Sequence, residues 1–453
     1  MVQETRVREL NNARIKDGAY VVYWMQASQR THYNYALEYA AATANDLKQP
    51  LVVVFGLMDD YPEANVRHYA FMLEGLRDVG LALARRQILF VVRRASPPDA
   101  AITMAARASL LVCDRGYLRH QKAWRNDVGN RAKVKAVEVE SDVVVPVDVA
   151  TTRQEYAART IRPKLHAHWP AYIQHLAERN IQYSSLGLGI KSDIDVSDPA
   201  VALSKLKVDR TVNESQRFTG GQTAATNRLA TFIDTLLDGY ASGRNEPAAG
   251  HSSRLSAYLH FGQISPVEMV LAARERSGEN NEDVLAFVEE LAVRRELSMN
   301  FANFSPQYDS YDGLPAWARK TLDQHASDSR PHIYSIEELE QSRTHDVYWN
   351  AAMTEMTRTG FMQNYMRMYW GKKVIEWTRS PREAFTILLH LNNKYFLCGR
   401  DPVSFASVGW IFGLHDRPWG PERSIFGLVR YMNAAGLERK FDMEAYVRKV
   451  SSL

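Results

Sequence analysis

Short apolar runs alternate with amphipathic segments through the first third of the chain. The apolar runs lie at 20–25, 51–58, 88–92, 110–113 and 136–140, and helical periodicity lies near 32–48, 67–85, 99–108 and 118–133. Strands that alternate with helices in this way build right-handed βαβ units around a parallel sheet. The pattern therefore predicts a Rossmann-like α/β domain over residues 1–185.

The pattern changes twice beyond this domain. Residues 186–212 are rich in Gly, Ser and Asp and lack sustained periodicity, which predicts a linker. From 213 to 453 helical periodicity dominates, strand signals nearly vanish, and Gly360 predicts a break between two helices in the aromatic segment 346–377. We expect an all-α domain whose apolar helix faces need a large partner, ordinarily other helices and alternatively a bound cofactor.

Composition and charge narrow the function classes. The 453 residues carry 56 Lys and Arg against 52 Asp and Glu, a formal net charge of +4, which permits one basic face but excludes a histone-like protein. Two cysteines exclude a disulfide framework and a cysteine-rich metal site. The longest apolar run, 51–58, is far too short to cross a bilayer. We expect a soluble intracellular protein, and no GxGxxG or P-loop motif is present.

Three serines precede an apolar segment at 251–265. Ser252, Ser253 and Ser256 could cap a helix, which is the commoner role, or present hydroxyl and amide donors to a phosphate. Upstream, the segment 239–247 carries the polar residues Tyr240, Arg244 and Asn245. Downstream, Glu290 is expected on a helix that also carries Arg294 and Arg295. Taken singly, each of these is an ordinary polar helix face.

A tryptophan between two proline-containing pairs marks the segment 413–432. Pro418 and Pro421 restrict the residues before them, so this stretch is expected to form a shaped loop rather than a helix. Arg417, Arg423 and Arg430 surround Trp419 with positive charge. The loop either plugs a core with its indole or presents an aromatic group among arginines to nucleic acid.

Five segments together strongly resemble the class II cyclobutane pyrimidine dimer photolyases of the photolyase/cryptochrome superfamily. They read SSRLSAYLHFGQIS, EELAVRREL, MRMYWGKKVIEW, LNNKYFLCGRDP and HDRPWGPERSIFGLVRYM, and the resemblance spans nearly the whole chain. It implies a deoxyribodipyrimidine photo-lyase whose helical domain holds FAD. In that family the fully reduced flavin absorbs blue light and donates an electron to a flipped-out pyrimidine dimer, the cyclobutane ring opens, and the electron returns.

The resemblance also implies the site residues. The expected flavin-binding residues are Tyr240, Arg244, Asn245, Ser252, Ser253, Leu255, Ser256, Arg367, Asn392 and Asp416. Asn392 would lie beside flavin N5, and Asp416 would pair with Arg244. Glu290 would bond the pyrimidine edge of the dimer, with Met368 and Trp410 lining the lesion pocket. Many superfamily members place a stacking tryptophan where this chain has Val293, so stacking is expected from Trp410 instead.

Three tryptophans match the electron-transfer chain of the class. They are Trp349, Trp370 and Trp377, with Trp370 expected nearest the flavin and Trp349 next. Trp370 and Trp377 are seven residues apart, two helical turns or about 10 Å along one helix face, a feasible separation for electron hopping between indoles. No metal is expected at the site.

The remaining expectations concern partners and alternatives. The substrate would be double-stranded DNA containing pyrimidine dimers, bound by a monomer without an obligatory protein partner, in the cytoplasm, nucleoid or nucleus according to the source. Segment 23–34 resembles the start of a class II antenna domain, for which a deazaflavin (8-HDF) is the family's commoner chromophore and FMN or an empty site the alternatives.

Three rival functions are weaker. A cryptochrome-like photoreceptor would share the fold and FAD, but the chain stops eleven residues after 439–442 rather than continuing into a long tail. A 6-4 photolyase would need histidines against the lesion, and the residues expected to line the lesion pocket include none. A non-enzymatic nucleic-acid binder would explain the loop at 413–432, which we call the Arg/Trp loop. It would not explain the serine-rich segment at 251–265 or the three tryptophans of the electron-transfer chain.

Overall fold

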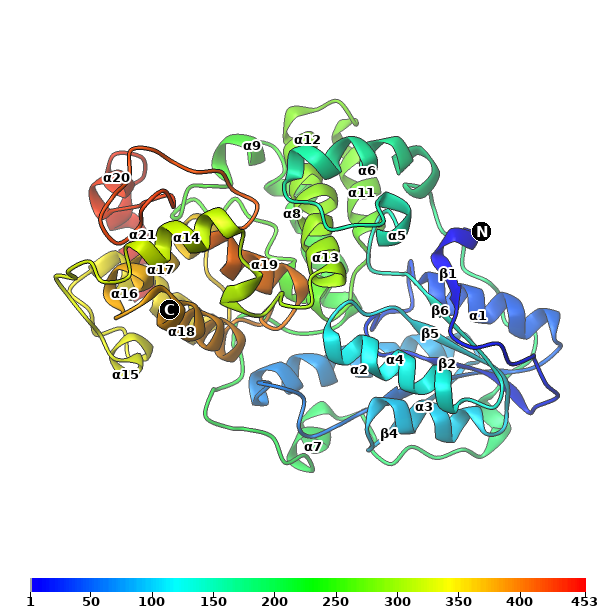
Figure 1. Cartoon of the computed structure of the whole chain (residues 1–453). Coiled ribbons are helices and arrows are strands. Elements are labelled where there is room, and N and C mark those ends of the chain that lie inside the picture. Colours follow the sequence, from blue (N-terminus) through cyan, green and yellow to red (C-terminus); the bar gives the residue numbers. More distant parts are fainter. Residues whose placement is uncertain (1) are drawn as a thin grey trace.

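All five predicted strands lie in one six-stranded sheet (Figure 1). The strands are β1 (Val7–Glu9), β2 (Tyr20–Trp24), β3 (Leu51–Gly56), β4 (Leu89–Arg93), β5 (Ala108–Asp114) and β6 (Lys135–Val139). Their order is β1-β6-β5-β2-β3-β4, and all pairs are parallel except β1 with β6, which is antiparallel. The strand order reverses direction between β2 and β5, and the carboxyl ends at such a point form a crevice that commonly binds ligands.

Four helices cover the sheet on both faces, as the α/β pattern predicts. They are α1 (Tyr35–Asp46), α2 (Val66–Arg85), α3 (Pro97–Ala105) and α4 (Arg119–Arg131). Residues of α1 and α2 pack with Val21 and Tyr23 of β2, whereas residues of α3 and α4 pack with the alternate positions Val22 and Trp24. Because successive strand residues point to opposite faces, the central strand is buried on both sides. The predicted α/β domain is confirmed.

The segment predicted as a linker is fixed to the sheet domain. It contains the short 3-10 turn η2 (Leu186–Leu188) and α7 (Pro199–Ser204), which packs on α2. The main-chain N–H groups of Leu89 and Val92 on β4 donate to the hydroxyls of Ser185 and Ser192, at 2.7 and 3.0 Å. The segment thereby covers the edge of the sheet that β4 would otherwise expose. The exact domain boundaries at 185 and 213 stay a prediction.

The remaining elements of the structure, which describes residues 2–453, are helical. Before β1 lies the 3-10 turn η1 (Glu4–Arg6), and after β6 lie α5 (Val147–Ala150) and α6 (Ala158–Tyr172). From α8 onward the elements are α8 (Gln222–Thr235), α9 (Tyr240–Gly243), α10 (Ser256–His260), α11 (Pro266–Ser277), α12 (Glu282–Glu289), η3 (Glu290–Arg294), α13 (Arg295–Phe304), η4 (Tyr311–Gly313), α14 (Ala316–Gln324), α15 (Ile336–Glu340), α16 (Val347–Thr359), α17 (Asn364–Trp377), α18 (Pro381–Tyr395), α19 (Pro402–Ile411), α20 (Ala434–Glu438) and α21 (Met443–Ser451). Among these described residues, no helix has the length and apolar character needed to span a membrane.

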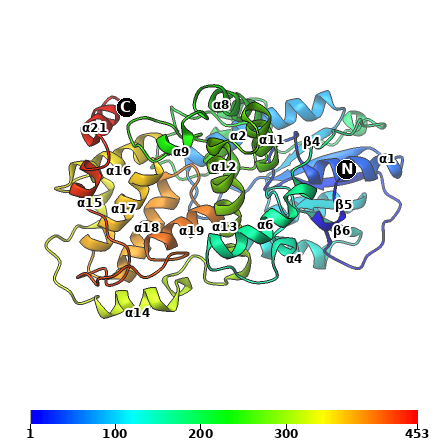
Figure 2. The same ribbon diagram turned by 90° about the horizontal axis from the view of Figure 1, so that it is seen from above.

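Gly360 separates α16 from α17, as predicted. It ends α16 with φ of +78°, in the left-handed region that glycine adopts without strain. α6 was not among the predicted elements and lies with the helical domain, packed on η3, although it precedes the linker in sequence (Figure 2). The chain therefore enters the helical domain at α6, returns along β4 of the sheet domain through residues 186–212, and then enters the helical domain again.

Arg67 joins the two domains. This residue of α2 is 2% exposed, and its guanidinium donates to the carbonyls of Asn213, Met356, Thr357 and Tyr395 at 2.5–3.3 Å. Three of these carbonyls belong to the last turns of α16 and α18, where helix carbonyls lack partners within the helix and carry partial negative charge. Burial lowers the pKa of Arg67 to about 10.

Two residues that flank Arg67 on the chain, Asn65 and His68, also contact the helical domain. The Asn65 amide donates to the carbonyl of Lys394 at 2.7 Å, and the His68 ring lies 3.1 Å from the carbonyl of Phe396. The His68 Nδ1 accepts the N–H of Asn65 at 3.1 Å, and its Nε2 also lies 2.8 Å from Arg400 Nη1 in the helical domain. The start of α2 therefore holds the end of α18 against the sheet domain.

We expect Arg67→Ala to lower the free energy of unfolding by about 3 kcal/mol or more, because several buried carbonyls would lose their donor. Denaturant unfolding would measure the change. Arg85→Ala, an exposed position on the same helix, is the matched control and should change stability by less than about 0.5 kcal/mol. Equal effects of the two substitutions would contradict a structural role for Arg67.

Candidate functional site

The helical domain contains a cavity of about 510 Å³, which we call the main cavity. Six of the predicted flavin-binding residues line it: Tyr240, Arg244, Asn245, Ser253, Ser256 and Arg367. Four of the predicted substrate-binding residues also line it: Glu290, Met368, Trp410 and Arg430. These side chains come from α9, α10, η3, α17 and α19 and the loops between them, so residues nearly 200 positions apart in sequence share one site.

Several predicted residues lie outside the lining of this cavity. Ser252 stays in the loop that precedes α10, because that helix begins only at Ser256. Leu255 is 1% exposed and belongs to the hydrophobic core. Asn392 is buried behind the wall, and its side-chain amide donates to the hydroxyl of Ser404, which does line the cavity. Asn392 thus contacts the site through a neighbour.

Glu290 pairs with Arg244 across the cavity. The Arg244 Nη1 lies 2.7 Å from Glu290 Oε1, with both side chains about one-third exposed. Burial alone would lower the pKa of Arg244, but the Glu290 carboxylate outweighs it and holds that pKa above its usual value. Glu290 begins the π-helical turn η3, a local irregularity of the kind often found at functional sites.

The expected pairing of Asp416 with Arg244 is wrong. Asp416 lies in the loop after α19, and its Oδ1 accepts hydrogen bonds from the main-chain N–H of Arg417 and the indole N–H of Trp419, at 2.8 and 3.1 Å. Arg244 meets Glu290 instead. Asp416 therefore shapes the Arg/Trp loop and does not line the main cavity.

Arg367 forms no ion pair with a carboxylate of residues 2–453, although Asp401 lines the same cavity. Its guanidinium lies 3.6 Å above the ring of Phe396 and 3.4 Å from the sulfur of Cys398, and its Nε is buried with no hydrogen-bond partner. An orphaned donor of this kind beside a large cavity fits a polar, anionic ligand such as a flavin nucleotide. Sequence reasoning placed Arg367 at the flavin but missed Cys398, which lines the same cavity.

Trp410 supplies the aromatic surface that Val293 does not. Val293 is fully buried within the helical core, whereas Trp410 lines the main cavity. The Arg294 guanidinium lies 5.2 Å from the centre of the Trp410 ring, and the His415 ring lies against the same indole at 6.0 Å. Trp410 is therefore held in place at the cavity wall, and its stacking on a lesion stays a prediction.

The three predicted electron-transfer tryptophans are buried together. Trp349, Trp370 and Trp377 are each at most 1% exposed. The indole N–H of Trp349 donates to the carbonyl of Trp370 at 2.9 Å, and the rings of Trp349 and Trp377 lie 5.6 Å apart. Trp349 thus lies between the other two.

Aromatic contacts continue this chain at both ends. Phe396, which holds the Arg367 guanidinium, also contacts the ring of Trp370 at 6.3 Å. At the far end Tyr334 and His345 contact Trp377, at 5.4 and 5.2 Å between ring centres. Sequence reasoning missed these two residues, because they lie outside the aromatic helices and no spacing signal links them to Trp377.

The Arg/Trp loop lies between α19 and α20 and contains no helix, as predicted. Trp419 is 37% exposed, so it does not plug a core. The guanidiniums of Arg417 and Arg430 lie 4.9 and 5.0 Å from the centre of its ring, and Asp416 accepts its indole N–H. The exposed indole is therefore held rigidly among cations.

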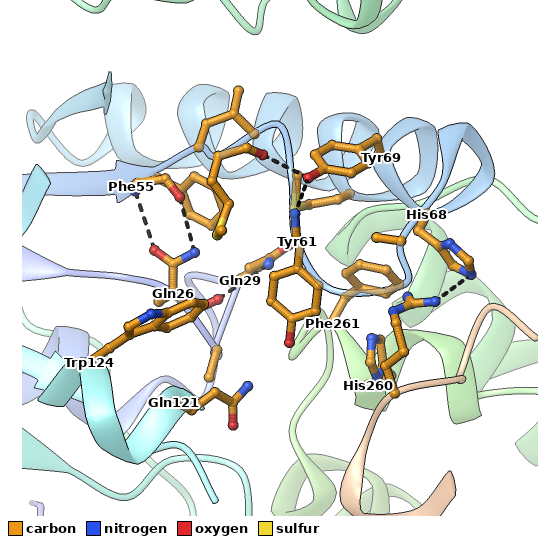
Figure 3. A pocket seen from close by; sticks show the side chains of 17 residues that line it. Gln26, Gln29, Phe55, Tyr61, His68, Tyr69, Gln121, Trp124, His260 and Phe261 are labelled. Carbon is orange, nitrogen blue, oxygen red and sulfur yellow. Dashed lines mark hydrogen bonds between the residues drawn. The ribbon is translucent and has the colours of Figure 1, made fainter. Parts of the chain in front are cut away.

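A second cavity of about 90 Å³ lies at the carboxyl ends of β2 and β3, next to the point where the strand order reverses (Figure 3). Gln26, Tyr61 and Trp124 line it from the sheet domain, and His260 and Arg400 line it from the helical domain. The Gln26 amide donates to the carbonyl of Gly56 at 3.1 Å and accepts the Trp24 indole N–H at 3.0 Å, which fixes the cavity wall.

Asp114 and Arg400 determine the shape and charge of this second cavity. The buried Asp114 Oδ2 accepts the main-chain N–H groups of Gln26, Ala27 and Ser28 at 2.8–2.9 Å, which holds the loop after β2. Arg400 is buried, and burial lowers its pKa to about 10. Its guanidinium donates to the carbonyl of Asn393 at 2.7 Å, and its Nε has no hydrogen-bond partner. An electron-rich or anionic ligand edge fits that end of the cavity.

This chain shares its fold, a sheet domain with covering helices joined to a helical domain, with solved structures of photolyases and a cryptochrome. A solved structure of an archaeal photolyase from Sulfolobus tokodaii, described as holding two FAD molecules, shares the fold with a TM-score of 0.70. That match covers 95% of this chain and 89% of the other at 16% identity.

Sequence comparison then gives the family. The DNA photolyase family model matches residues 21–180. A deoxyribodipyrimidine photo-lyase from Methanothermobacter thermautotrophicus is 47% identical over 454 residues, covering 100% of this chain and 99% of that protein. A deoxyribodipyrimidine photo-lyase from Potorous tridactylus is 38% identical, covering 95% of this chain and 81% of the other. This chain therefore belongs to the DNA photolyase family.

Proposed function

We propose that this chain is a class II photolyase that splits cyclobutane pyrimidine dimers in DNA, with reduced FAD in the main cavity. The observation that carries the proposal is the joint position of six predicted flavin-binding residues and four predicted substrate-binding residues around one cavity. When bound, FAD supplies the light-driven electron. The protein's own task is to hold both ligands and to control the charges around them.

Glu290 and Arg244 are the residues best placed to orient the lesion. The ion pair between them keeps the carboxylate of Glu290 fixed at the cavity wall, where its second oxygen can accept the N–H of a pyrimidine edge. Trp410 offers a ring face for stacking, and Arg367 offers its unpaired charge to the flavin nucleotide. These groups are set by packing before any ligand arrives, which reduces the cost of ordering the site.

The second cavity is the proposed antenna site. Its position where the strand order reverses favours a planar ligand beside Tyr61 and Trp124, and Arg400 favours an electron-rich edge at the other end. A deazaflavin, whose ring system can carry negative charge, suits this environment better than FMN. The cavity also adjoins the helical domain through His260, a position suitable for passing excitation energy to the main cavity.

The first prediction concerns the cofactor. FAD should copurify at about one molecule per chain, because the buried Arg367 Nε is left without a hydrogen-bond partner and Ser253 and Ser256 line the same cavity. Spectroscopy of the heat-released chromophore measures this. A folded, colourless protein that does not bind added FAD would contradict the proposal, and bound FAD with no light-dependent repair would favour a photoreceptor.

The second prediction concerns the tryptophans. Trp370→Phe should block photoreduction of the oxidised flavin while leaving repair by chemically reduced enzyme nearly unchanged, because the aromatic path restores the cofactor and does not touch the lesion. Steady illumination followed by absorption spectroscopy measures both. Trp24→Phe, a buried tryptophan of the sheet domain, is the matched control. Normal photoreduction in Trp370→Phe would remove this residue from the path.

The third prediction concerns the Arg/Trp loop. Extruding a dimer leaves a gap in the duplex, and a rigid indole among guanidiniums can fill or border it. Arg417→Ala or Arg430→Ala should therefore weaken binding to dimer-containing duplex at least about tenfold more than binding to a single strand with the same lesion, without loss of FAD. Titrations with both DNAs test this, and equal losses would leave these arginines as general phosphate contacts.

A further inference from the structure

A cavity of about 390 Å³ adjoins the main cavity and is not explained by the flavin or the lesion. We call it the basic cleft. It shares Tyr365, Arg430 and Met432 with the lining of the main cavity and extends away from it toward α20. A ligand segment that leaves the main cavity at Arg430 would therefore pass directly into the basic cleft.

Four cations surround the basic cleft. Arg423, Arg430, Arg439 and Lys440 line it, and none of its lining residues is acidic. Among residues 2–453 none of the four forms an ion pair with a carboxylate; Lys440 instead donates to the Tyr365 hydroxyl at 3.1 Å. Like charges around one cavity repel each other, so this arrangement favours binding of an anion.

Aromatic rings hold these cations in position. The Arg423 guanidinium lies 5.3 Å from the centre of the Tyr431 ring, and Lys440 Nζ lies 5.5 Å from the centre of the Tyr365 ring. Tyr365 is itself packed edge-on against Phe441 at 4.7 Å. The positive groups are thus partly ordered before binding, which lowers the entropy that a ligand must overcome.

We propose that the basic cleft binds backbone phosphates of the damaged DNA strand next to the extruded dimer. This inference rests on the proposed function, since a dimer in the main cavity brings its flanking nucleotides toward Arg430, which lines both cavities. Phosphates are the anions that such a strand brings at every nucleotide, and arginine and lysine are their usual partners. Arg439 and Lys440 are new substrate-binding residues in this assignment.

Salt titration of DNA affinity tests the assignment. Arg439→Gln and Lys440→Gln, both exposed positions, should each reduce the slope of log affinity against log salt by about 0.9 on a dimer-containing duplex and about 0.7 on a single strand. Arg343→Gln, an exposed arginine that lines neither cavity, is the matched control and should leave the slope unchanged. An unchanged slope in both cleft variants would overturn the inference.

Neutral methylphosphonate linkages, introduced one at a time, identify the strand. In the unmodified protein, a methylphosphonate next to the dimer on the damaged strand should weaken binding. In Arg439→Gln, the same methylphosphonate should weaken binding little further. If the coupled position lies on the undamaged strand, the assignment to the damaged strand is wrong. Loss of binding to a free mononucleotide such as AMP, with the DNA salt slope intact, would instead assign the cleft to a small phosphate ligand.

Repair assays on the same preparations distinguish a failure of the basic-cleft assignment from a failure of the proposed function. If the unmodified protein with reduced FAD repairs dimers under blue light but the cleft variants keep the full salt slope, only the assignment of the basic cleft fails. If the unmodified protein repairs no dimer on any DNA, the proposed function itself fails.

Discussion

The buried Arg67 guanidinium is the interaction on which the arrangement of both domains depends. It brings a charge into the interior without a carboxylate, and the carbonyl ends of α16 and α18 compensate it. α16 carries Trp349, and α18 carries Asn392 and leads directly to Phe396, Cys398 and Asp401. A single side chain of the sheet domain thus sets the position of one wall of the main cavity and of the middle of the aromatic path.

Charge is distributed differently among the three cavities, and the difference follows their proposed ligands. The main cavity pairs one arginine with Glu290 and leaves Arg367 free, which suits a site that must hold both a neutral base edge and an anionic nucleotide. The cavity at the sheet presents a buried Arg400 beside aromatic rings. The basic cleft has cations alone. Burial limits how many charges remain unpaired, and Arg439 and Lys440 of the basic cleft are exposed.

Much of the fold follows from the sequence because β2 to β6 and α1 to α4 carry continuous or periodic apolar patterns. β1 was missed, since Val7–Glu9 is short, mixed in polarity and partly exposed. α6 contains Pro163 and Pro170, which hide its periodicity. At the site, the structure brings most of the predicted residues that lie in or next to helices to one cavity. The partner of Asp416 was not, because side-chain direction in an irregular loop depends on contacts that no spacing encodes, and the Arg67 junction joins residues about 290–330 positions apart.

The path of the chain between the domains has a further consequence. α6 packs on the helical domain before the segment 186–212 returns to β4, so the helical domain includes chain from both sides of that segment. A single break there would leave two fragments that still enclose each other's hydrophobic surfaces. The two domains are therefore connected by packed chain segments and not by a flexible linker. The relative orientation of two chromophores held in these domains would be as rigid as the interior of one domain.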